Sequence, residues 1–419
     1  MPRILVASLP FAGHVTVLSA VAVELALRGH DVVAYTGAKY AGRFAGAAWL
    51  PWERATDFDD ADLSATFPAV GDGKGLRGGR ANVEHVLLGT AAGQAADILT
   101  ANTGQPFDAV VGDQLAFGAA TAAEALKIPW VTVAVTPLQL SSRDLPPPGM
   151  PWPVGTGPVG RFRDATVRRI VSGVSRRVLD PRLNAIRRTA GLGPVPPGAF
   201  FDALHSPQLV LAQGVPGLEY VRGDLPEHVH FVGRMAAAGP VGELPGWWAD
   251  LDGGLPVVHV TQGTLDTDAD DLLRPALEAL ADEPVLVVAT TGGPALAGAV
   301  PANARVAAFV PHDRLLPRVD VMVTNGGWNG VLAAVAAGVP LVVAGGSLDK
   351  PEVARRVARS GAGIDLRTPK PSPERIRRAV RTVLDHPGMT ARAAELGSAM
   401  AAAGGTAAGV DLIENLLVR

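Results

Sequence analysis

The sequence predicts an α/β protein with two parallel sheets, each covered by helices on both faces. Three observations point to this fold: short β-branched runs recur along the chain, helical patterns separate them, and the runs are almost continuously apolar. Strands of a parallel sheet that is buried on both faces have this composition, and they are joined by crossover helices. The chain has 419 residues, which at roughly 100–200 residues per domain suggests two or three domains.

The expected elements alternate along both halves of the chain. In order, the expected strands are Arg3–Leu9, Asp31–Tyr35, Asp108–Gly112, Trp130–Val135, Val257–Thr261, Val285–Ala289, Arg305–Phe309, Val321–Thr324 and Leu341–Ala344. Helical patterns are found at Leu18–Arg28, Leu115–Leu126, Leu272–Ala281, Gly330–Ala337 and Val410–Val418. Because parallel α/β sheets bind ligands at the carboxyl ends of their strands, the segments that follow these strands are the candidate sites.

Two stretches interrupt the alternation and suggest the domain organisation. Pro137–Pro158 is too rich in proline for regular structure and predicts a long loop. Gly214–Gly254 is rich in glycine and proline, so we place the domain boundary there. The expected organisation is a first domain at 1–213, a linker region at 214–254, a second domain at 255–405 and a last helix at 406–419 that packs back toward the first domain.

Composition and charge exclude several classes of protein. The residues are 48% hydrophobic and 18% charged, as in globular rather than disordered chains. A formal net charge of −3 argues against a basic nucleic-acid-binding face and gives no reason to bind an anionic membrane. The absence of cysteine excludes disulfides, thiolate catalysis and Cys-ligated metals. The uncharged segments Ile4–Val23 and Val321–Leu348 contain Pro, Gly, His or Asn, so they predict buried strand–helix units, and we expect a cytoplasmic protein.

The first strand leads into a histidine rather than a nucleotide-binding glycine motif. A dinucleotide fold needs G-x-G-x-x-G at this turn, and the segment Pro10–Val15 contains only Gly13. His14 at this strand-to-helix turn is a candidate general base, although a helix-capping or core role is also open. Asp113 follows the strand Asp108–Gly112 at the same sheet edge, where it would either orient the imidazole or cap the next helix.

Four strand ends in the second half carry small or polar residues. They are Thr261–Thr264, Phe309–His312, Thr324–Gly330 and Asp349–Glu352. Glycines at a helix N-terminus allow bare amides to face an anion, and the helix dipole favours its charge. As a set, these segments predict a pocket for a phosphate and a sugar. Acidic pairs such as Asp57/Asp59 and Asp266/Asp268 have the spacing of a metal-binding motif, but pairs this frequent are typical of solvated loops, and we expect no metal.

These residues resemble the metal-independent nucleotide-sugar glycosyltransferases of the GT-B type, which include the bacterial enzymes that decorate natural products. The strongest marker is the segment Phe309–Leu366, and the pair Gly13-His14 is similar to the family's position for the base. The resemblance covers nearly the whole chain. It implies two Rossmann-like domains that face each other across a cleft, no cofactor, and transfer of a hexose with inversion from a UDP- or dTDP-sugar to a small, largely apolar acceptor.

The resemblance also implies roles for individual residues. His14 would deprotonate the acceptor hydroxyl and Asp113 would orient His14. Phe11, Gly13 and Leu138 would contact the acceptor, and Phe309 and Val310 would contact the base of the donor. The remaining donor-binding residues would be Gly263, Thr264, Asn325, Gly327, Trp328, Asn329, Gly330, Asp349 and Lys350. The expected partners are these two small molecules, with neither nucleic acid nor a membrane, and the protein would be a monomer or a homodimer.

The chain departs from the family pattern at three of these positions and at Ala333. Asn325 replaces the usual histidine and Lys350 the usual glutamine, so one hypothesis is that Lys350 supplies the missing positive charge. Plant relatives have serine at Gly330 and a ribose-binding glutamate at Ala333, whose loss should weaken discrimination between UDP and dTDP. Two alternatives stay open: an enzyme similar to nucleotide-sugar 2-epimerases, and a non-catalytic pseudo-glycosyltransferase. The acceptor, the sugar and the choice of O- or N-linkage do not follow from the sequence.

Overall fold

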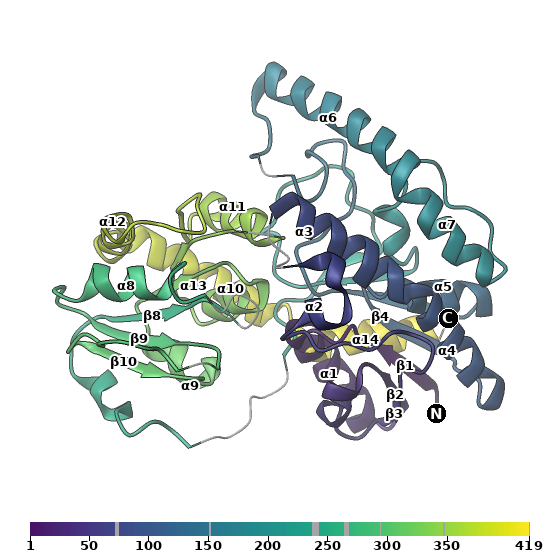
Figure 1. Cartoon of the computed structure of the whole chain (residues 1–419), viewed down its shortest axis with the longest axis horizontal. Helices are drawn as coiled ribbons and strands as arrows, with labels where there is room; N and C mark the ends of the chain where they lie inside the picture. The colour runs from purple at the N-terminus through teal and green to yellow at the C-terminus, as the bar shows by residue number, and fades with distance from the viewer. Residues whose placement is uncertain are drawn as a thin grey trace. The chain divides into compact units, whose positions relative to one another are not determined.

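The computed structural model describes residues 1–71, 75–150, 152–236, 243–263, 268–293, 295–346 and 348–418. The chain forms two compact units (Figure 1). Unit 1 consists of Met1–Gln213, Val221–Ala237 and Gly404–Arg419, and unit 2 of Gly214–Tyr220 and Ala238–Ala403. The expected linker region 214–254 is therefore divided between the two units.

Unit 1 contains a seven-stranded sheet in the order β3-β2-β1-β4-β5-β6-β7, and all its strand pairs are parallel. Its strands are β1 (Arg3–Ala7), β2 (Asp31–Tyr35), β3 (Ala48–Leu50), β4 (Ala109–Asp113), β5 (Trp130–Ala134), β6 (Leu209–Ala212) and β7 (Val229–Phe231). Its helices are α1 (Ala12–Leu27), α2 (Leu63–Thr66), α3 (Gly75–Ala81), α4 (Leu88–Gly104), α5 (Phe117–Leu126), α6 (Gly157–Val178), α7 (Asp180–Thr189) and α14 (Gly405–Leu417). Short 3-10 helices lie at η1 (Ala38–Arg43), η2 (Pro68–Val70) and η4 (Asp202–Leu204), and a π-helical segment lies at η3 (Asn82–Leu87).

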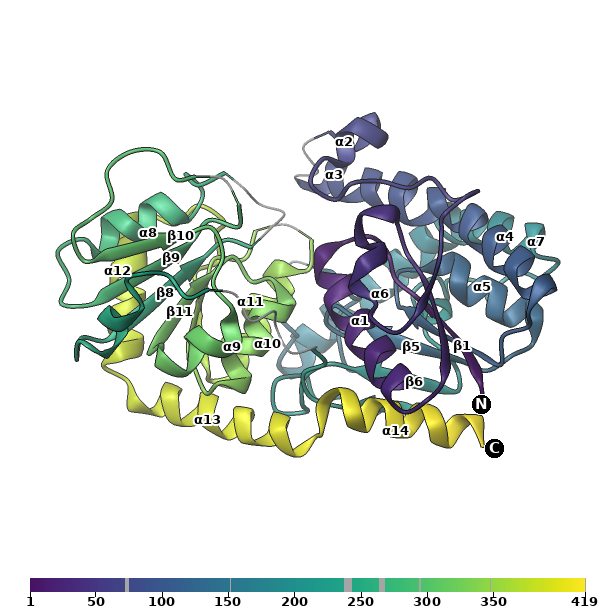
Figure 2. The same ribbon diagram turned by 90° about the horizontal axis from the view of Figure 1, so that it is seen from below.

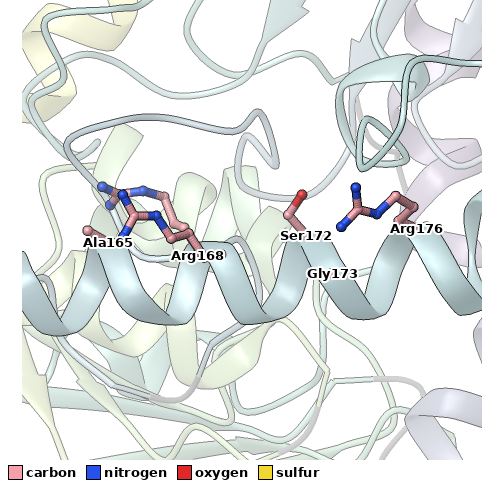
Figure 3. Close-up of a pocket in the computed structure, with 6 residues that line it drawn as sticks. Ala165, Arg168, Ser172, Gly173 and Arg176 are labelled. Atoms are coloured by element: carbon pink, nitrogen blue, oxygen red, sulfur yellow. The ribbon is translucent and has the colours of Figure 1, made fainter.

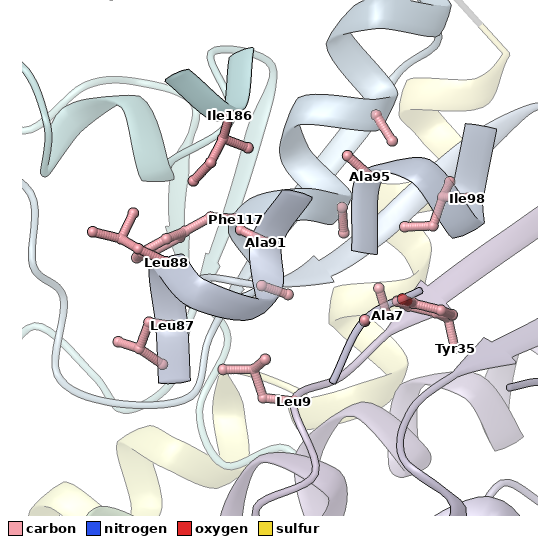
Figure 4. Packing of buried hydrophobic residues seen from close by; sticks show 14 of the residues in the cluster. Ala7, Leu9, Tyr35, Leu87, Leu88, Ala91, Ala95, Ile98, Phe117 and Ile186 are labelled. Carbon is pink, nitrogen blue, oxygen red and sulfur yellow. The ribbon is translucent and has the colours of Figure 1, made fainter. Parts of the chain in front are cut away.

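Successive side chains of β1 enter two different cores, because a strand points its side chains alternately to the two faces of a sheet. Ile4 and Val6 pack with α1 and α14 on one face. Leu5, Ala7 and the following Leu9 pack with α4, α5 and α7 on the other. Figure 4 shows Ala7 and Leu9 close to the α4 residues of this second core, and Figure 2 shows α14 lying beside α1. A strand buried on both faces explains the continuous apolar run in the sequence.

Unit 2 repeats the plan with a six-stranded parallel sheet in the order β10-β9-β8-β11-β12-β13. Its strands are β8 (Val257–Thr261), β9 (Leu286–Thr290), β10 (Ala304–Ala307), β11 (Val321–Thr324), β12 (Leu341–Val343) and β13 (Gly363–Asp365). Its helices are α8 (Leu273–Leu280), α9 (His312–Leu315), α10 (Trp328–Ala336), α11 (Lys350–Ser360), α12 (Pro373–Leu384) and α13 (Pro387–Ala402), with turns η5 (Trp248–Asp252) and η6 (Leu316–Arg318). One face of the sheet packs with α8 and α12, and the other with α10, α11 and α13.

The predicted α/β fold with two parallel sheets is confirmed, and the differences lie at element ends and in short strands. Four strands were not predicted, β3, β6, β7 and β13, and each has only three or four residues. Runs this short give only a weak pattern in the sequence. Helix α1 begins at Ala12 rather than at Leu18, so His14 lies in the first turn of the helix.

Each sheet has one point where the strand order reverses, so that the connections leaving two adjacent parallel strands run in opposite directions. Ligands bind at such points in open α/β sheets. In unit 1 this point lies between β1 and β4, with Ala7 opposite Gly112. In unit 2 it lies between β8 and β11, with Thr261 opposite Thr324. Asp113 is the last residue of β4, and the segments that follow the other three strands contain His14, Gly263 and Asn325 of the predicted site.

The described chain contains one helical stretch that is apolar and long enough to cross a membrane by length and composition, Pro387–Leu417. It comprises α13 and α14, which are separated at Gly404 with φ of 80°. Both helices bury apolar side chains, Leu396 and Met400 in unit 2 and Val410 and Ile413 in unit 1. Core helices have this behaviour, so the stretch is weak support for a membrane span.

Candidate active site

His14 and Asp113 form a close pair at the carboxyl ends of β1 and β4. His14 Nδ1 lies 2.5 Å from Asp113 Oδ2. The Asp113 side chain is 0% exposed, whereas that of His14 is 16% exposed. An ionised carboxylate can only accept hydrogen bonds, so Nδ1 carries the proton and Nε2 is the nitrogen left to accept one. This is the geometry of a general base held in one tautomer by a buried carboxylate.

Two backbone amides also fix the Asp113 carboxylate. The Leu9 amide donates to Oδ2 at 3.3 Å and the Leu115 amide donates to Oδ1 at 2.9 Å. The first of these bonds ties Asp113 to the segment that leads into α1. The second resembles the helix-capping alternative, but α5 begins only at Phe117 with Ala116 as its N-cap residue. Asp113 therefore contacts His14 and the turn after β4 at the same time.

The predicted acceptor contacts are not equally open. The Phe11 ring is mostly buried and lies 5.2 Å from both the His14 ring and the Phe58 ring, measured between centroids. Gly13 follows in the first turn of α1 and is exposed. Leu138 is buried in a small core with Ala134 and Val210, so its side chain belongs to the packing of β5 and β6.

The proline-rich loop over β5 has no regular element among its described residues before α6 begins at Gly157. Hydrogen bonds to Asp224 hold the first part of this loop in place. Asp224 accepts from the Ser142 hydroxyl and from the Arg143 amide, both at 2.7 Å.

Sequence reasoning missed a buried glutamine beside the histidine–aspartate pair. Gln114 follows Asp113, and its side-chain amide donates to the Thr136 hydroxyl. Gln114 Oε1 is buried without a hydrogen-bond partner in the described part of the chain. The only signal in the sequence was its position next to Asp113 at a strand end.

Asn325 connects the ends of β8 and β11 in unit 2. Its side-chain amide donates to the Gln262 carbonyl, and its Oδ1 accepts from the Gly327 amide at 3.3 Å. Gly263, with φ of 77°, lies against this side chain: a Cβ there would be 3.5 Å from both Oδ1 and Nδ2 of Asn325. The carboxamide thus shapes the glycine loop, and its second amide hydrogen is the one left for a ligand.

The loop before α10 approaches α11 closely. Gly326 has φ of 89°, and a Cβ at this position would be 2.9 Å from Val343 and 3.2 Å from the Lys350 carbonyl. Gly327 is the N-cap residue of α10 and has no side-chain cap, so the first amides of α10 are not capped by that residue. Gly327, Asn329 and Gly330 are partly exposed. Bare amides at a helix N-terminus are suited to binding an anion.

The other predicted donor residues follow four different strands, β8, β10, β11 and β12. Phe309 is 67% exposed, whereas the next residue, Val310, is buried. Asp349 is the N-cap residue of α11, and Lys350, its first residue, is buried. Thr264 lies outside the described residues. Trp328 is a core residue: its ring packs against Gly214, and its Nε1 is buried without a hydrogen-bond partner in the described ranges.

His312 lies close to Gly330 in the first turn of α10 and contacts a second histidine, His259, which sequence reasoning missed. The ring centroids of His259 and His312 are 5.5 Å apart, and a Cβ at Gly330 would be 3.9 Å from His312 Cε1. His259 is fully buried and its Nδ1 contacts the Val288 carbonyl at 2.9 Å. Burial lowers the pKa of His259 to about 3, and the neighbouring His312 lowers it as well. His259 is therefore neutral at physiological pH.

A surface hollow lies along α6 of unit 1. It measures about 520 Å³ and is lined by residues of that helix alone, Ala165, Arg168, Arg169, Ser172, Gly173 and Arg176 (Figure 3). None of the predicted site residues lines it. Within the described residues, no group of three or more His, Asp or Glu side chains could hold a metal ion.

Comparison with known proteins identifies the family. The family model for the C-terminal domain of erythromycin biosynthesis protein CIII-like proteins matches residues 273–415. The 4'-demethylrebeccamycin synthase of Lentzea aerocolonigenes is 42% identical over 418 residues, which are 99% of each chain. UDP-glycosyltransferase 2 of Phaeomoniella chlamydospora is 30% identical, over 94% of this chain and 91% of its own length.

Solved structures agree with the fold. The glycotransferase of kitacinnamycin has a TM-score of 0.75 with 24% identity over 99% of both chains. Glycosyltransferase VinC, solved in complex with dTDP, has a TM-score of 0.71 with 21% identity over the full length of both chains. At this level of identity the likeness concerns the fold, and it is the GT-B fold of two parallel-sheet domains.

The two parallel sheets and the matches together define a nucleotide-sugar-dependent glycosyltransferase. The chain belongs to the EryCIII-like family of natural-product glycosyltransferases. It transfers a sugar from a nucleotide sugar to a natural-product acceptor. The matches give no support to the epimerase or the non-catalytic alternative.

Proposed function

We propose that this enzyme transfers a hexose, with inversion, from a UDP- or dTDP-sugar to a hydroxyl group of a small, largely apolar acceptor. His14 is the general base and Asp113 orients it. The observation that carries the proposal is the 2.5 Å contact between His14 Nδ1 and the buried Asp113 carboxylate. A partly exposed imidazole with a buried carboxylate partner is suited to accepting a proton and to stabilising the cation that results.

The proposed transfer uses the base of unit 1 to activate the acceptor and the anion-binding groups of unit 2 to stabilise the leaving diphosphate. The acceptor binds beside Phe11, and Nε2 of His14 removes its hydroxyl proton. The oxygen attacks the anomeric carbon of the sugar from the face opposite the diphosphate, and the bond between that carbon and the diphosphate oxygen breaks. The leaving nucleoside diphosphate takes the electron pair, and its charge is stabilised by the first amides of α10 and by Asn325. The reaction needs no cofactor, and we propose that it takes place in the cytoplasm.

Both nucleotides are represented among the relatives. The protein of P. chlamydospora is named a UDP-glycosyltransferase, and VinC was solved with dTDP. Ala333 is buried in the core of unit 2 and offers no carboxylate to the ribose. We therefore expect weak discrimination between UDP and dTDP, and a strong preference for UDP would contradict this part of the proposal.

Thermal unfolding with UDP, dTDP, GDP and NAD tests donor binding before an acceptor is known. A ligand at about 100 times its Kd should stabilise the folded protein by about 2.7 kcal/mol. We expect UDP and dTDP to raise the Tm and GDP and NAD to leave it unchanged. If neither UDP nor dTDP raises the Tm, the donor site proposed in unit 2 is wrong.

Lys350 provides a second test of the donor site. Its backbone lies beside Gly326 in the glycine loop, and Asn325 cannot become cationic. If the Lys350 side chain supplies the positive charge that binds the diphosphate, Lys350→Gln should weaken UDP or dTDP binding about tenfold, because hydrogen bonds to charged groups contribute roughly 1.5–3 kcal/mol. Isothermal calorimetry measures this, with Lys370→Gln as the matched surface control. Unchanged affinity in Lys350→Gln would remove Lys350 from donor binding.

A further inference from the structure

The first turn of α1, which carries His14, is capped by a carboxylate from a distant segment. Asp60 Oδ2 accepts from the Ala12 amide at 2.8 Å, although the two residues are 48 positions apart. The N-cap residue of α1, Phe11, has no side chain that can cap the helix. The first turn has no acidic residue of its own. Asp60 therefore takes the place of a local cap, and it accounts for the early start of the helix at Ala12.

The Asp60 carboxylate is itself held in place from η1. The Tyr40 hydroxyl lies 2.8 Å from both of its oxygens, and Lys39 Nζ donates to Oδ1 at 2.6 Å. The Asp60 side chain is 5% exposed, whereas that of Lys39 is 37% exposed. A buried carboxylate with this many hydrogen-bond partners is held in a single position. A helix amide that donates a hydrogen bond to it is therefore held in place as well.

Close packing joins the same segments. A Cβ at Gly37, just before η1, would be 2.9 Å from the Cβ of Pro10, so the backbone of η1 lies directly against the segment that leads into α1. Asp57 Oδ2 accepts from the Ala38 amide at 2.8 Å, which fixes the start of η1. The segment 57–60 thus supports η1 through Asp57 and α1 through Asp60.

The position of Asp60 has an electrostatic consequence for His14. The N-terminus of a helix carries a partial positive charge, which disfavours a cation in the first turn. His14 lies in that turn, and in the proposed reaction it becomes an imidazolium when it removes the hydroxyl proton of the acceptor substrate. A carboxylate at the same helix end offsets the positive end of the dipole. Asp113 stabilises the cation through direct contact, and Asp60 does so through the helix end.

We infer that Asp60 is a positioning residue for His14. Asp60 fixes the first turn of α1, and its charge at the N-terminus of this helix favours the protonated form of the imidazole. This inference rests on the proposed role of His14 as the base. The charged groups to consider around this turn, in the described part of the chain, are Asp113 from β4, Asp60 with Asp57 and Asp59 from the segment after β3, and Lys39 from η1, which also bonds Asp59. Tyr40 is the other titratable group, and burial and Asp60 raise its pKa to about 12, so it is neutral.

Titration of His14 by NMR tests the inference without a substrate. The nine histidines are labelled with ¹³C at Cε1 in the full-length protein, and the His14 signal is assigned from its absence in His14→Gln. In Asp60→Asn, the midpoint of the His14 titration should fall by about half a pH unit, the size expected for a charge at a helix end. In Lys39→Met, Asp60 loses its cation, so the midpoint should rise.

Asp62→Asn is the matched control. Asp62 belongs to the same acidic run but caps α2, where it accepts from the Ala65 amide at 3.1 Å. It should leave the His14 midpoint within about 0.1 pH unit of the native value, since exposed charges are strongly screened. Shifts of opposite sign in Asp60→Asn and Lys39→Met support the inference, because general loosening of the turn would move both in one direction. No shift in either variant overturns it.

The enzyme assay separates this inference from the proposed function. With a working acceptor, Asp60→Asn should lower kcat several-fold while KM for the donor is unchanged, and it should have no further effect in a His14→Ala background. If His14→Ala is fully active, the proposed base is wrong whatever Asp60 does. If His14→Ala is inactive but Asp60→Asn has native kcat and a native titration midpoint, only the inference about Asp60 fails.

Discussion

Replacing His14 with alanine should lower kcat for sugar transfer by roughly 10²- to 10⁴-fold, the usual contribution of a general base. The imidazole is the partly exposed member of the pair, and its Nδ1 is committed to Asp113. Alanine removes the proton acceptor without disturbing unit 2, where the donor is proposed to bind. Product formation and release of UDP or dTDP, measured at saturating donor, give kcat for the native and variant enzymes.

A control variant distinguishes the loss of the general base from the general effect of replacing a histidine with alanine. His85 lies in η3 of the same unit and is exposed, so His85→Ala should retain native kcat. Asp113→Asn should also lower kcat, because an amide can hold His14 in the wrong tautomer. The Tm shift caused by UDP or dTDP should be native in all three variants. Native kcat in His14→Ala would exclude His14 as the base for that acceptor.

The sequence was sufficient to predict the two sheets because their central strands are buried on both faces. β2, β8 and β11 have the predicted ends, and apart from Asp31 in β2 and His259 in β8 they consist of apolar and β-branched residues. Their order also places the ends of β1 and β4 side by side, as it does those of β8 and β11. The proximity of His14 to Asp113, and of Asn325 to the segment after β8, follows from this topology.

The sequence was not sufficient where a residue acts through the backbone of another segment. Nothing local marks Asp60 as the cap of α1, because the pairing depends on how the chain after β3 returns to the sheet edge. Likewise, Asn325 has the position of a ligand-binding residue in the sequence, but part of its hydrogen-bonding capacity is used to join β8 to β11. Leu138 and Trp328 are apolar, and their side chains belong to the cores. A sequence motif identifies the position of a site residue, whereas packing and hydrogen bonding in the fold determine which of its atoms can contact a ligand.

A buried ion pair explains why Gly214–Tyr220 belongs to unit 2 although it follows the last residues of a unit 1 segment. Arg356 of α11 is 1% exposed, and it contacts Glu219 at 2.9 Å and Glu352 at 2.7 Å. Its guanidinium also lies over the Tyr220 ring, 4.6 Å from the centroid. Burial alone would lower the pKa of Arg356, but Glu219 and Glu352 raise it above its ordinary value. The cation is therefore fully paired.

Arg356→Leu should destabilise unit 2 by about 3–5 kcal/mol, because it leaves the buried Glu219 carboxylate without its cation. At roughly 2–4 °C per kcal/mol, the Tm should fall by about 6–20 °C, which differential scanning calorimetry measures. The exposed Arg359 provides the control: it donates to the Glu219 carbonyl at 3.1 Å, and Arg359→Leu should cost less than about 1 kcal/mol.

The double variant Arg356→Leu/Glu219→Leu distinguishes the ion pair from simple packing. Removing both charges eliminates the buried carboxylate that has lost the Arg356 cation, so the double variant should recover much of the Tm lost in Arg356→Leu. If packing by the long arginine side chain were the main contribution, the second substitution would lower the Tm further instead. Because α11 begins at Lys350, next to Asp349 of the proposed donor site, the same variants should also report whether fixing this helix affects donor binding. We expect UDP or dTDP affinity to fall in Arg356→Leu and to recover with the Tm in the double variant.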